Sequence, residues 1–273
     1  MGTTLRECKE VRSVFRINKQ QHKEIHVMAT KTTIQKDKLD GFISRYYLGG
    51  LGKSVVWNYD GKKLTTDFAA EARTMKGTVT FKGLGYPDAF KLGIFDTERL
   101  TKLIGVLDNT CDLKVAVVDT EAKSIDLYDG HSTAHFMLSS VDMIPQPPKA
   151  KELPKMDVGV KLTKELIERF IKGANALSEV GTFTVTVGKT GATFTIGYTS
   201  VASNSIAVDA ELDFSKSISP ITFPTAVFKE IFSANKEAKG MTFEVSEKGL
   251  AKLEFESDDY KTQYFVVSTE EAK

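Results

Sequence analysis

The sequence predicts an α+β protein of two similar domains, each built from a duplicated β-α-β-β-β unit with its helices on one face of antiparallel sheets. Three observations lead to this class. An apolar phrase occurs four times at near-constant spacing, strand-like runs follow each copy, and a proline-rich segment separates the second copy from the third. A fixed period indicates repeated structural units, so it is considered before any individual element.

The repeated phrase is an apolar residue, four residues of any kind, an apolar residue, two of any kind, and two apolar residues. Copies begin at Ile34, Phe95, Leu162 and Phe223, at offsets of 61, 67 and 61 residues. Apolar residues three and four apart share one face of a helix. The phrase therefore predicts amphipathic helices at 35–47, 96–108, 163–176 and 224–236.

Strand-like segments surround each predicted helix. The segments before the four helices are "TKTTI", "AFKLGIF", "DVGVKL" and "SPITF". Three alternating runs rich in Thr, Val and Phe follow each helix, as in "TFTVTVG", "ATFTIGYT" and "NSIAVDAEL" after the third. Such alternation between turn residues is typical of half-buried strands. The run "NSIAVDAEL" (204–212) is expected to form a single strand.

The segment "MIPQPPKAKELPK" (143–155) holds four of the seven prolines in the chain. Proline cannot donate a hydrogen bond to a sheet and favours extended linkers. We therefore expect one domain at 28–144, a Pro-rich connector at 145–155, and a second domain at 156–273.

Residues 1–27 differ from the rest, with six Lys/Arg, three Glu and no strand alternation. Two interpretations stay open. The segment is either an upstream leader ahead of a true start at Met28, since Lys23 and Glu24 can be encoded by a purine-rich ribosome-binding sequence, or a disordered basic arm.

Composition excludes several classes. The net charge of +1 comes from the first 27 residues, and the rest of the chain, with 31 basic and 33 acidic residues, is not a general polyanion binder. No apolar run approaches the ~20 residues of a membrane span, and no signal-peptide core is present. The two cysteines, Cys8 and Cys111, are too few for a disulfide framework. A cytoplasmic protein is expected.

Doubled strand–helix–three-strand units joined by a Pro-rich connector resemble the DNA polymerase sliding clamps. The likeness covers 28–273 and is greatest to the clamps of T-even-type bacteriophages, then to proliferating cell nuclear antigen. It implies the DNA clamp fold and a homotrimeric ring that encircles duplex DNA and tethers the replicative DNA polymerase for processive synthesis. It also implies an ATP-dependent clamp loader as a partner, no catalysis, no cofactor and, for a viral protein, the host bacterial cytoplasm.

In such a ring the helices would line the hole. The four predicted helices carry ten basic and eight acidic residues, whereas the rest of 28–273 is net acidic. Contact with phosphates without reading bases suits a protein that slides. The basic residues expected to face DNA are Lys36, Lys38, Arg45, Arg99, Lys102, Lys164, Arg169, Lys172, Lys229 and Lys236.

A partner site is expected beside the connector, on the outer face. Val141, Met143, Ile144 and Leu153 form an apolar set with no predicted element to bury it, and methionine adapts to different partners. By resemblance, Phe255 and Val267 form the other wall of this site. The competing interpretation is that these residues only pin the connector to the domains. The resemblance also places the trimer contacts at 132–139 and 204–212.

Two alternatives belong to other classes. The first is a β-rich viral structural or tail protein with duplicated domains. The second is an enzyme that binds nucleotide at Gly52-Lys53-Ser54, but Tyr47 stands where a phosphate loop needs glycine and "SVVWNY" predicts a strand, not a helix. His131 and His135 lack a third ligand, so no metal site is expected, and no nucleophile with its base is found.

Overall fold

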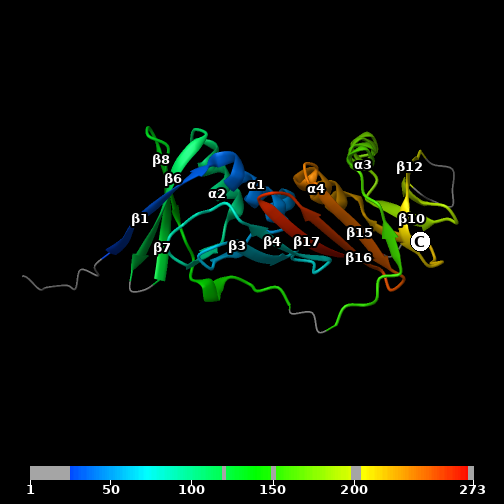
Figure 1. The fold of residues 1–273 in the computed structure, drawn as a ribbon, viewed down its shortest axis with the longest axis horizontal. Helices are drawn as coiled ribbons and strands as arrows, with labels where there is room; N and C mark the ends of the chain where they lie inside the picture. Colours follow the sequence, from blue (N-terminus) through cyan, green and yellow to red (C-terminus); the bar gives the residue numbers. More distant parts are fainter. Residues whose placement is uncertain (1–24, 119–120, 149–151, 198–203, 270–273) are drawn as a thin grey trace, which may run out of the picture.

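The computed structural model describes residues 25–118, 121–148, 152–197 and 204–269 (Figure 1). The first half of the chain contains β1 (Ile25–Gln35), α1 (Lys36–Tyr47), η1 (Leu48–Gly50), β2 (Val55–Tyr59), β3 (Leu64–Ala69), β4 (Met75–Phe81), β5 (Phe90–Ile94), α2 (Thr97–Gly105), β6 (Thr110–Val118), β7 (Glu121–Tyr128), β8 (Thr133–Met137) and η2 (Val141–Met143). The second half contains β9 (Val158–Val160), α3 (Lys164–Ala176), β10 (Thr182–Val187), β11 (Ala192–Ile196), β12 (Ile206–Ala210), β13 (Leu212–Ser215), β14 (Ile221–Pro224), α4 (Thr225–Asn235), β15 (Gly240–Ser246), β16 (Leu250–Glu256) and β17 (Tyr260–Val267).

The α+β class and the four predicted helices are confirmed, although α2 ends at Gly105, three residues early. Two helix starts have side-chain caps. Asp96 accepts a hydrogen bond from the backbone N–H of Arg99, and Thr163 accepts one from that of Leu166. Such caps satisfy N–H groups that have no partner inside the helix. The first strand begins at Ile25, so the prediction for 1–27 lies almost entirely outside the described residues.

The strand expected at 204–212 is confirmed as β12, which ends at Ala210, but the separate strand β13 that starts at Leu212 was not predicted. The chain forms β12, which pairs with β11, and then β13, which pairs with β9 in another sheet. The change of sheet falls at Glu211, whose carbonyl accepts a hydrogen bond from the backbone N–H of Lys161. Apart from β13, each quarter of the chain has the order strand, helix, three strands. Descent of the four quarters from one duplicated unit stays a hypothesis.

The strands of the described residues form three antiparallel sheets. Their orders are β1-β6-β7-β8, β12-β11-β10-β14 and β13-β9-β15-β16-β17-β4-β3-β2-β5. Figure 1 shows the four helices along one side of the sheets, in the order α2, α1, α4, α3. Residues 144–148 and 152–157, which follow η2 in the chain, lie on the opposite side. The sheets therefore separate a helical face from a face that carries the connector.

The two halves meet where β17 pairs with β4, from Tyr260 opposite Phe81 to Val266 opposite Met75. The central sheet thus runs from one half into the other without interruption. The connector divides the chain in sequence, but this junction joins its two halves by a ladder of hydrogen bonds. The domain boundaries at 144/145 and 155/156 stay a prediction.

Helix α1 packs across this junction. The Arg45 guanidinium carbon lies 4.0 Å from the centroid of the Tyr260 ring, and Arg45 Nη1 donates to the carbonyl of Gly41 at 2.6 Å. Tyr264 Oη donates to the carbonyl of Arg45 at 2.9 Å and accepts from Asn235 Nδ2 at 3.0 Å. Burial raises the pKa of both tyrosines to about 12. Buried polar groups that are paired in this way hold one arrangement of the two halves.

Candidate nucleic-acid interface

The basic residues of α1 make contacts that stabilise the fold. Arg45 is 8% exposed beneath Tyr260, so its prediction as a DNA-facing residue is wrong. Lys36 Nζ donates to the carbonyl of Leu107 at 2.8 Å, just beyond the end of α2, where a cation complements the helix dipole. Lys38 forms an ion pair of 2.9 Å with Asp259. The three basic side chains of α1 therefore all interact with groups of the chain itself.

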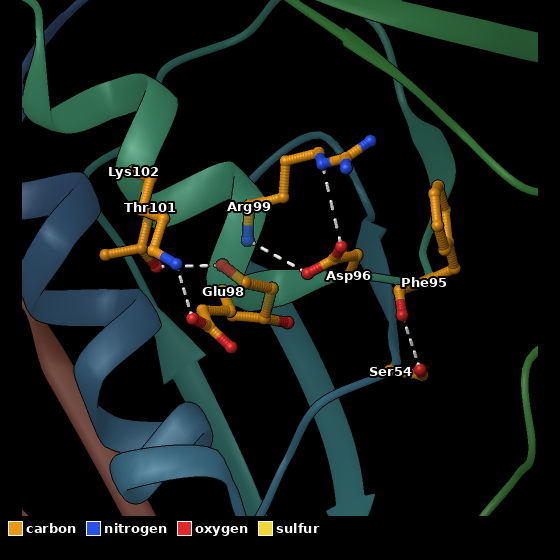
Figure 2. Close-up of polar contacts among 8 residues, drawn as sticks. Ser54, Phe95, Asp96, Glu98, Arg99, Thr101 and Lys102 are labelled. Atoms are coloured by element: carbon orange, nitrogen blue, oxygen red, sulfur yellow. Dashed lines mark hydrogen bonds and ion pairs between the residues drawn. The ribbon is translucent and has the colours of Figure 1, made fainter.

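The basic residues of α2 point into solvent but have acidic neighbours (Figure 2). Lys102 Nζ lies 2.5 Å from Glu98 Oε1, and hydrogen bonding to this carboxylate raises the pKa of Lys102. Arg99 Nε lies 3.8 Å from Asp96 Oδ2. The two basic side chains are 74% and 70% exposed, and ion pairs between exposed side chains contribute little to stability. Both side chains can therefore exchange their carboxylate for a phosphate.

The other five predicted DNA-facing residues lie on α3 and at α4. Lys164, Arg169, Lys172 and Lys236 are exposed and Lys229 is half-buried. Within the described part of the chain, none of the five forms an ion pair. Lys229 and Lys236 are seven residues apart, two helical turns, and so share one side of α4. The basic side chains of the helical face that have no ion-pair partner among the described residues therefore lie in the second half of the chain.

The predicted partner residues do not form one site. Ile144 is 4% exposed, and a Cβ placed on Gly93 of β5 would lie 3.4 Å from its Cγ1, so Ile144 fixes the connector to the sheet. Phe255 is 2% exposed and packs edge-on against Phe232 of α4, on the helical side. Both predictions are wrong as partner contacts.

The remaining four predicted partner residues are accessible. Met143 is 76% exposed, Leu153 and Val267 are also exposed, and Val141 is half-buried.

Two grooves flank the start of the connector. The first, which we call the connector groove, has a volume of about 350 Å³ and is lined by Asp67, Phe68, Lys76, Gly77, Thr78, Gln146, Pro147, Pro148, Gln263 and Phe265. The second has about 380 Å³ and is lined by Leu51, Lys53, Ser54, Ala69, Ala70, Glu71, Arg73 and Pro145 to Pro148. Sequence reasoning placed a groove beside the connector but missed these strand residues, which lie far from it in the chain.

No nucleotide site forms at Gly52-Lys53-Ser54. Ser54 Oγ donates to the carbonyl of Phe95 at 2.6 Å (Figure 2), and the strand β2, not a helix, follows at Val55. A Cβ on Gly52 would lie 2.2 Å from the carbonyl oxygen of Tyr46, so glycine is needed for this close backbone contact.

The described residues give no sign of a metal centre. None of their His, Cys, Asp and Glu side chains gather in a group of three or more that could hold a metal ion. His135 instead contacts the carboxylate of Asp126 at 2.5 Å. Among the described helices, none is long and apolar enough to cross a membrane.

Comparison with known proteins gives a structural match alone. No protein-family model matches the chain, and no curated protein matches its sequence. Among solved structures, the chain is similar to the proliferating cell nuclear antigen of Entamoeba histolytica, with a TM-score of 0.68 and 12% identity over 88% of this chain and 98% of that one. The chain therefore has the sliding-clamp fold. The likeness to clamps of T-even-type bacteriophages stays a prediction.

Proposed function

We propose that this protein is a sliding clamp. Three copies join head to tail into a ring around duplex DNA, and the ring tethers a replicative DNA polymerase during processive synthesis. An ATP-dependent clamp loader opens and closes the ring, and the protein has no catalysis of its own. The alternative of a viral structural or tail protein is supported by no feature described above.

The observation that carries the proposal is the internal junction between β17 and β4. At this junction the four strands β9-β15-β16-β17 of the second half meet the four strands β4-β3-β2-β5 of the first half. The two outer sheets, which end in free edges, have corresponding strand orders. One outer sheet ends as β1-β6-β7-β8 and the other begins as β12-β11-β10-β14. Pairing β8 of one copy with β12 of the next would therefore build the same arrangement between chains.

The hydrogen-bond registers of the two sets also agree. Asp126 opposite His135 in the β7–β8 ladder corresponds to Glu254 opposite Gln263 in the β16–β17 ladder, at a constant offset of 128 residues. In the same way Thr65 opposite Thr80 corresponds to Thr193 opposite Asp209, with an offset of 129 on the last strand. The internal junction can therefore serve as a template for the contact between copies.

This template fixes a register. Gln263 opposite Thr78 becomes His135 opposite Ala207 of the next copy, and Tyr264 opposite Gly77 becomes Phe136 opposite Ile206. Phe136 is buried and His135 and Ala207 are exposed, so apolar side chains meet on the core side of the new ladder. Edges with unpaired backbone groups are the usual sites of strand addition.

The edges β8 and β12 lie near opposite ends of the molecule, at the left and the right of Figure 1. Contacts between two different surfaces are head to tail, and such contacts form a ring when the rotation closes. In that ring the helical face with Lys172 and Lys236 would line the hole, while the connector groove would open outward. The experiment that tests the proposal is imaging of single particles, for which we expect a closed ring of three chains.

Polymerase binding gives a further test at the connector groove. Thr78 and Thr80 project from the same face of β4, but only Thr78 lines the groove. Changing Thr78 to Arg should fill the groove and place a charge on its floor, because the lining includes Phe68, Phe265 and two prolines. Affinity for the polymerase, measured by calorimetry, should fall at least about tenfold, which is 1.4 kcal/mol.

Thr80→Arg is the matched control and should bind polymerase as the wild type does. Both variants should retain the mass of the wild-type assembly, since neither residue lies on β8 or β12. If Thr78→Arg and Thr80→Arg bind equally well, the partner does not use the connector groove.

A further inference from the structure

A further groove, of about 270 Å³, opens between the start of α3 and the free strand β12. Its lining comprises Lys161, Thr163, Glu165, Leu166, Arg169, Asp209, Ala210 and Glu211. Lys161 is paired with Glu211 at 3.1 Å, and Asp209 accepts a hydrogen bond from Thr193 Oγ1 at 2.8 Å. The Arg169 side chain is exposed and forms no ion pair or hydrogen bond with any described residue. We call this feature the α3–β12 groove.

The α3–β12 groove has a filled counterpart at the internal junction. At the offsets given above, its positions Leu166, Arg169, Ala210 and Glu211 correspond to Lys38, Gly41, Phe81 and Lys82. Each of these four residues contacts the turn at Asp259 and Tyr260, which enters β17.

Two of the contacts come from β4 and the residue after it. The rings of Phe81 and Tyr260 stack with centroids 5.3 Å apart. The backbone N–H of Lys82 donates to the carbonyl of Asp259 at 2.9 Å. The other two come from α1: the carbonyl of Lys38 accepts from Tyr260 Oη at 2.7 Å, and a Cβ on Gly41 would lie 2.6 Å from that oxygen. The internal turn thus occupies the space that is open in the α3–β12 groove.

Asp259 and Tyr260 correspond, at the offset of 128, to His131 and Ser132. These two residues lie in the turn between β7 and β8, at the free edge. The occupant indicated by the template is therefore the turn 129–132 of a second copy.

At the proposed contact between copies, the large and small side chains stand at the opposite positions from those of the internal junction. Internally, the large Tyr260 lies over Gly41, and Arg45 covers the tyrosine ring. Between copies, the position of Tyr260 is Ser132, that of Gly41 is Arg169, and that of Arg45 is Gly173. A small turn residue therefore faces a large helical one, and an arginine side chain from position 169 has the space that Tyr260 and Arg45 fill internally. Such exchange conserves volume, which packed contacts require.

We propose that the α3–β12 groove receives the turn 129–132 of a second copy of this chain, and that Arg169 fills this contact and pairs with the partner's Asp129. The proposal rests on the proposed ring and assigns Arg169 to the contact between copies instead of to DNA.

The charge of the turn suits this role. Asp129 Oδ1 accepts from the backbone N–H groups of Ser132 and His131 at 2.6 and 2.8 Å, and Oδ2 accepts from that of Asp108 at 2.9 Å. These hydrogen bonds, led by that of Ser132, lower the pKa of Asp129 to about 2. The carboxylate is thus ionised and held in place, and a guanidinium that reaches it gains a charge-assisted hydrogen bond without ordering a mobile partner.

The test compares two charge reversals on the same helix. Arg169→Glu places a negative charge against the partner's Asp129, whereas Lys172→Glu changes the charge by the same amount one turn later and outside the groove. Light scattering over a concentration series should show that Arg169→Glu raises the concentration for half-dissociation by at least about tenfold, because truncating or reversing one partner of an interface pair weakens association strongly. Lys172→Glu should assemble as the wild type does.

A second pair of variants tests the fit of the turn 129–132 in the α3–β12 groove. Arg169→Gly should weaken assembly, and adding Ser132→Tyr should restore it by reproducing the Gly41–Tyr260 pair between copies. Wild-type assembly of Arg169→Glu, or no gain from Ser132→Tyr, would overturn the proposal. A wild-type chain that stays monomeric would instead overturn the proposed ring, so the two failures can be told apart.

Discussion

Processive synthesis on primed circular DNA should fall by about tenfold or more when Lys172 and Lys236 are both changed to Glu. The two lysines are exposed, belong to different elements of the helical face, and form no ion pair within the described residues. In a ring of three copies each substitution occurs three times, and every lost phosphate contact weakens binding and lowers its salt dependence. The variant should keep the mass of the wild-type assembly.

The control carries the same charge change on the opposite side of the sheets. Lys91 of β5 and Lys114 of β6 are exposed and alternate with buried residues, so their side chains project away from the helical face. Changing both to Glu should leave processive synthesis close to that of the wild type. Equal loss in the two double variants would mean that total charge, and not the helical face, determines the effect.

Complete covalent linkage between copies is expected for the pair His135→Cys and Ala207→Cys in a Cys8→Ser background. In the register proposed from the internal junction, these two positions lie directly opposite each other in neighbouring copies. Opposed residues of antiparallel strands have Cα atoms about 4.5–5.5 Å apart, within the range of a disulfide. Cys111 is buried, so it should not compete. Oxidation followed by a non-reducing gel should show a product of three chains.

The register is tested by shifting one partner. His135→Cys combined with Val208→Cys places the second thiol one residue along, on the other face of β12, where Val208 is buried. This control should link poorly. Efficient linkage of the shifted pair, or failure of the aligned pair in a sample that assembles, would contradict the register.

The helices were predictable because each depends on a local pattern. The apolar phrase indicates one face of a helix, and Phe42, Phe170 and Phe228 are buried on that face. Arg45 could not be assigned correctly in the same way. It is buried by Tyr260, more than two hundred residues later, and no local pattern contains that contact.

Phe255 differs, because the sequence did contain a signal for it. In β16, Ala251, Leu253 and Phe255 alternate with Lys252 and Glu254, so Phe255 falls on the apolar side of the strand and is buried. The connector groove had no such signal. Its lining combines β3, β4, β17 and the connector, and pairing between distant strands decides which of their residues meet.

The most direct test of the proposed clamp is an image of single particles of the purified chain. A sliding clamp should appear as a closed ring with a central hole, made of three copies of a chain of 30.1 kDa and showing six similar lobes, because each chain contributes two halves. Separate elongated particles of one chain at micromolar concentration, or open filaments built by the same head-to-tail contact, would contradict it.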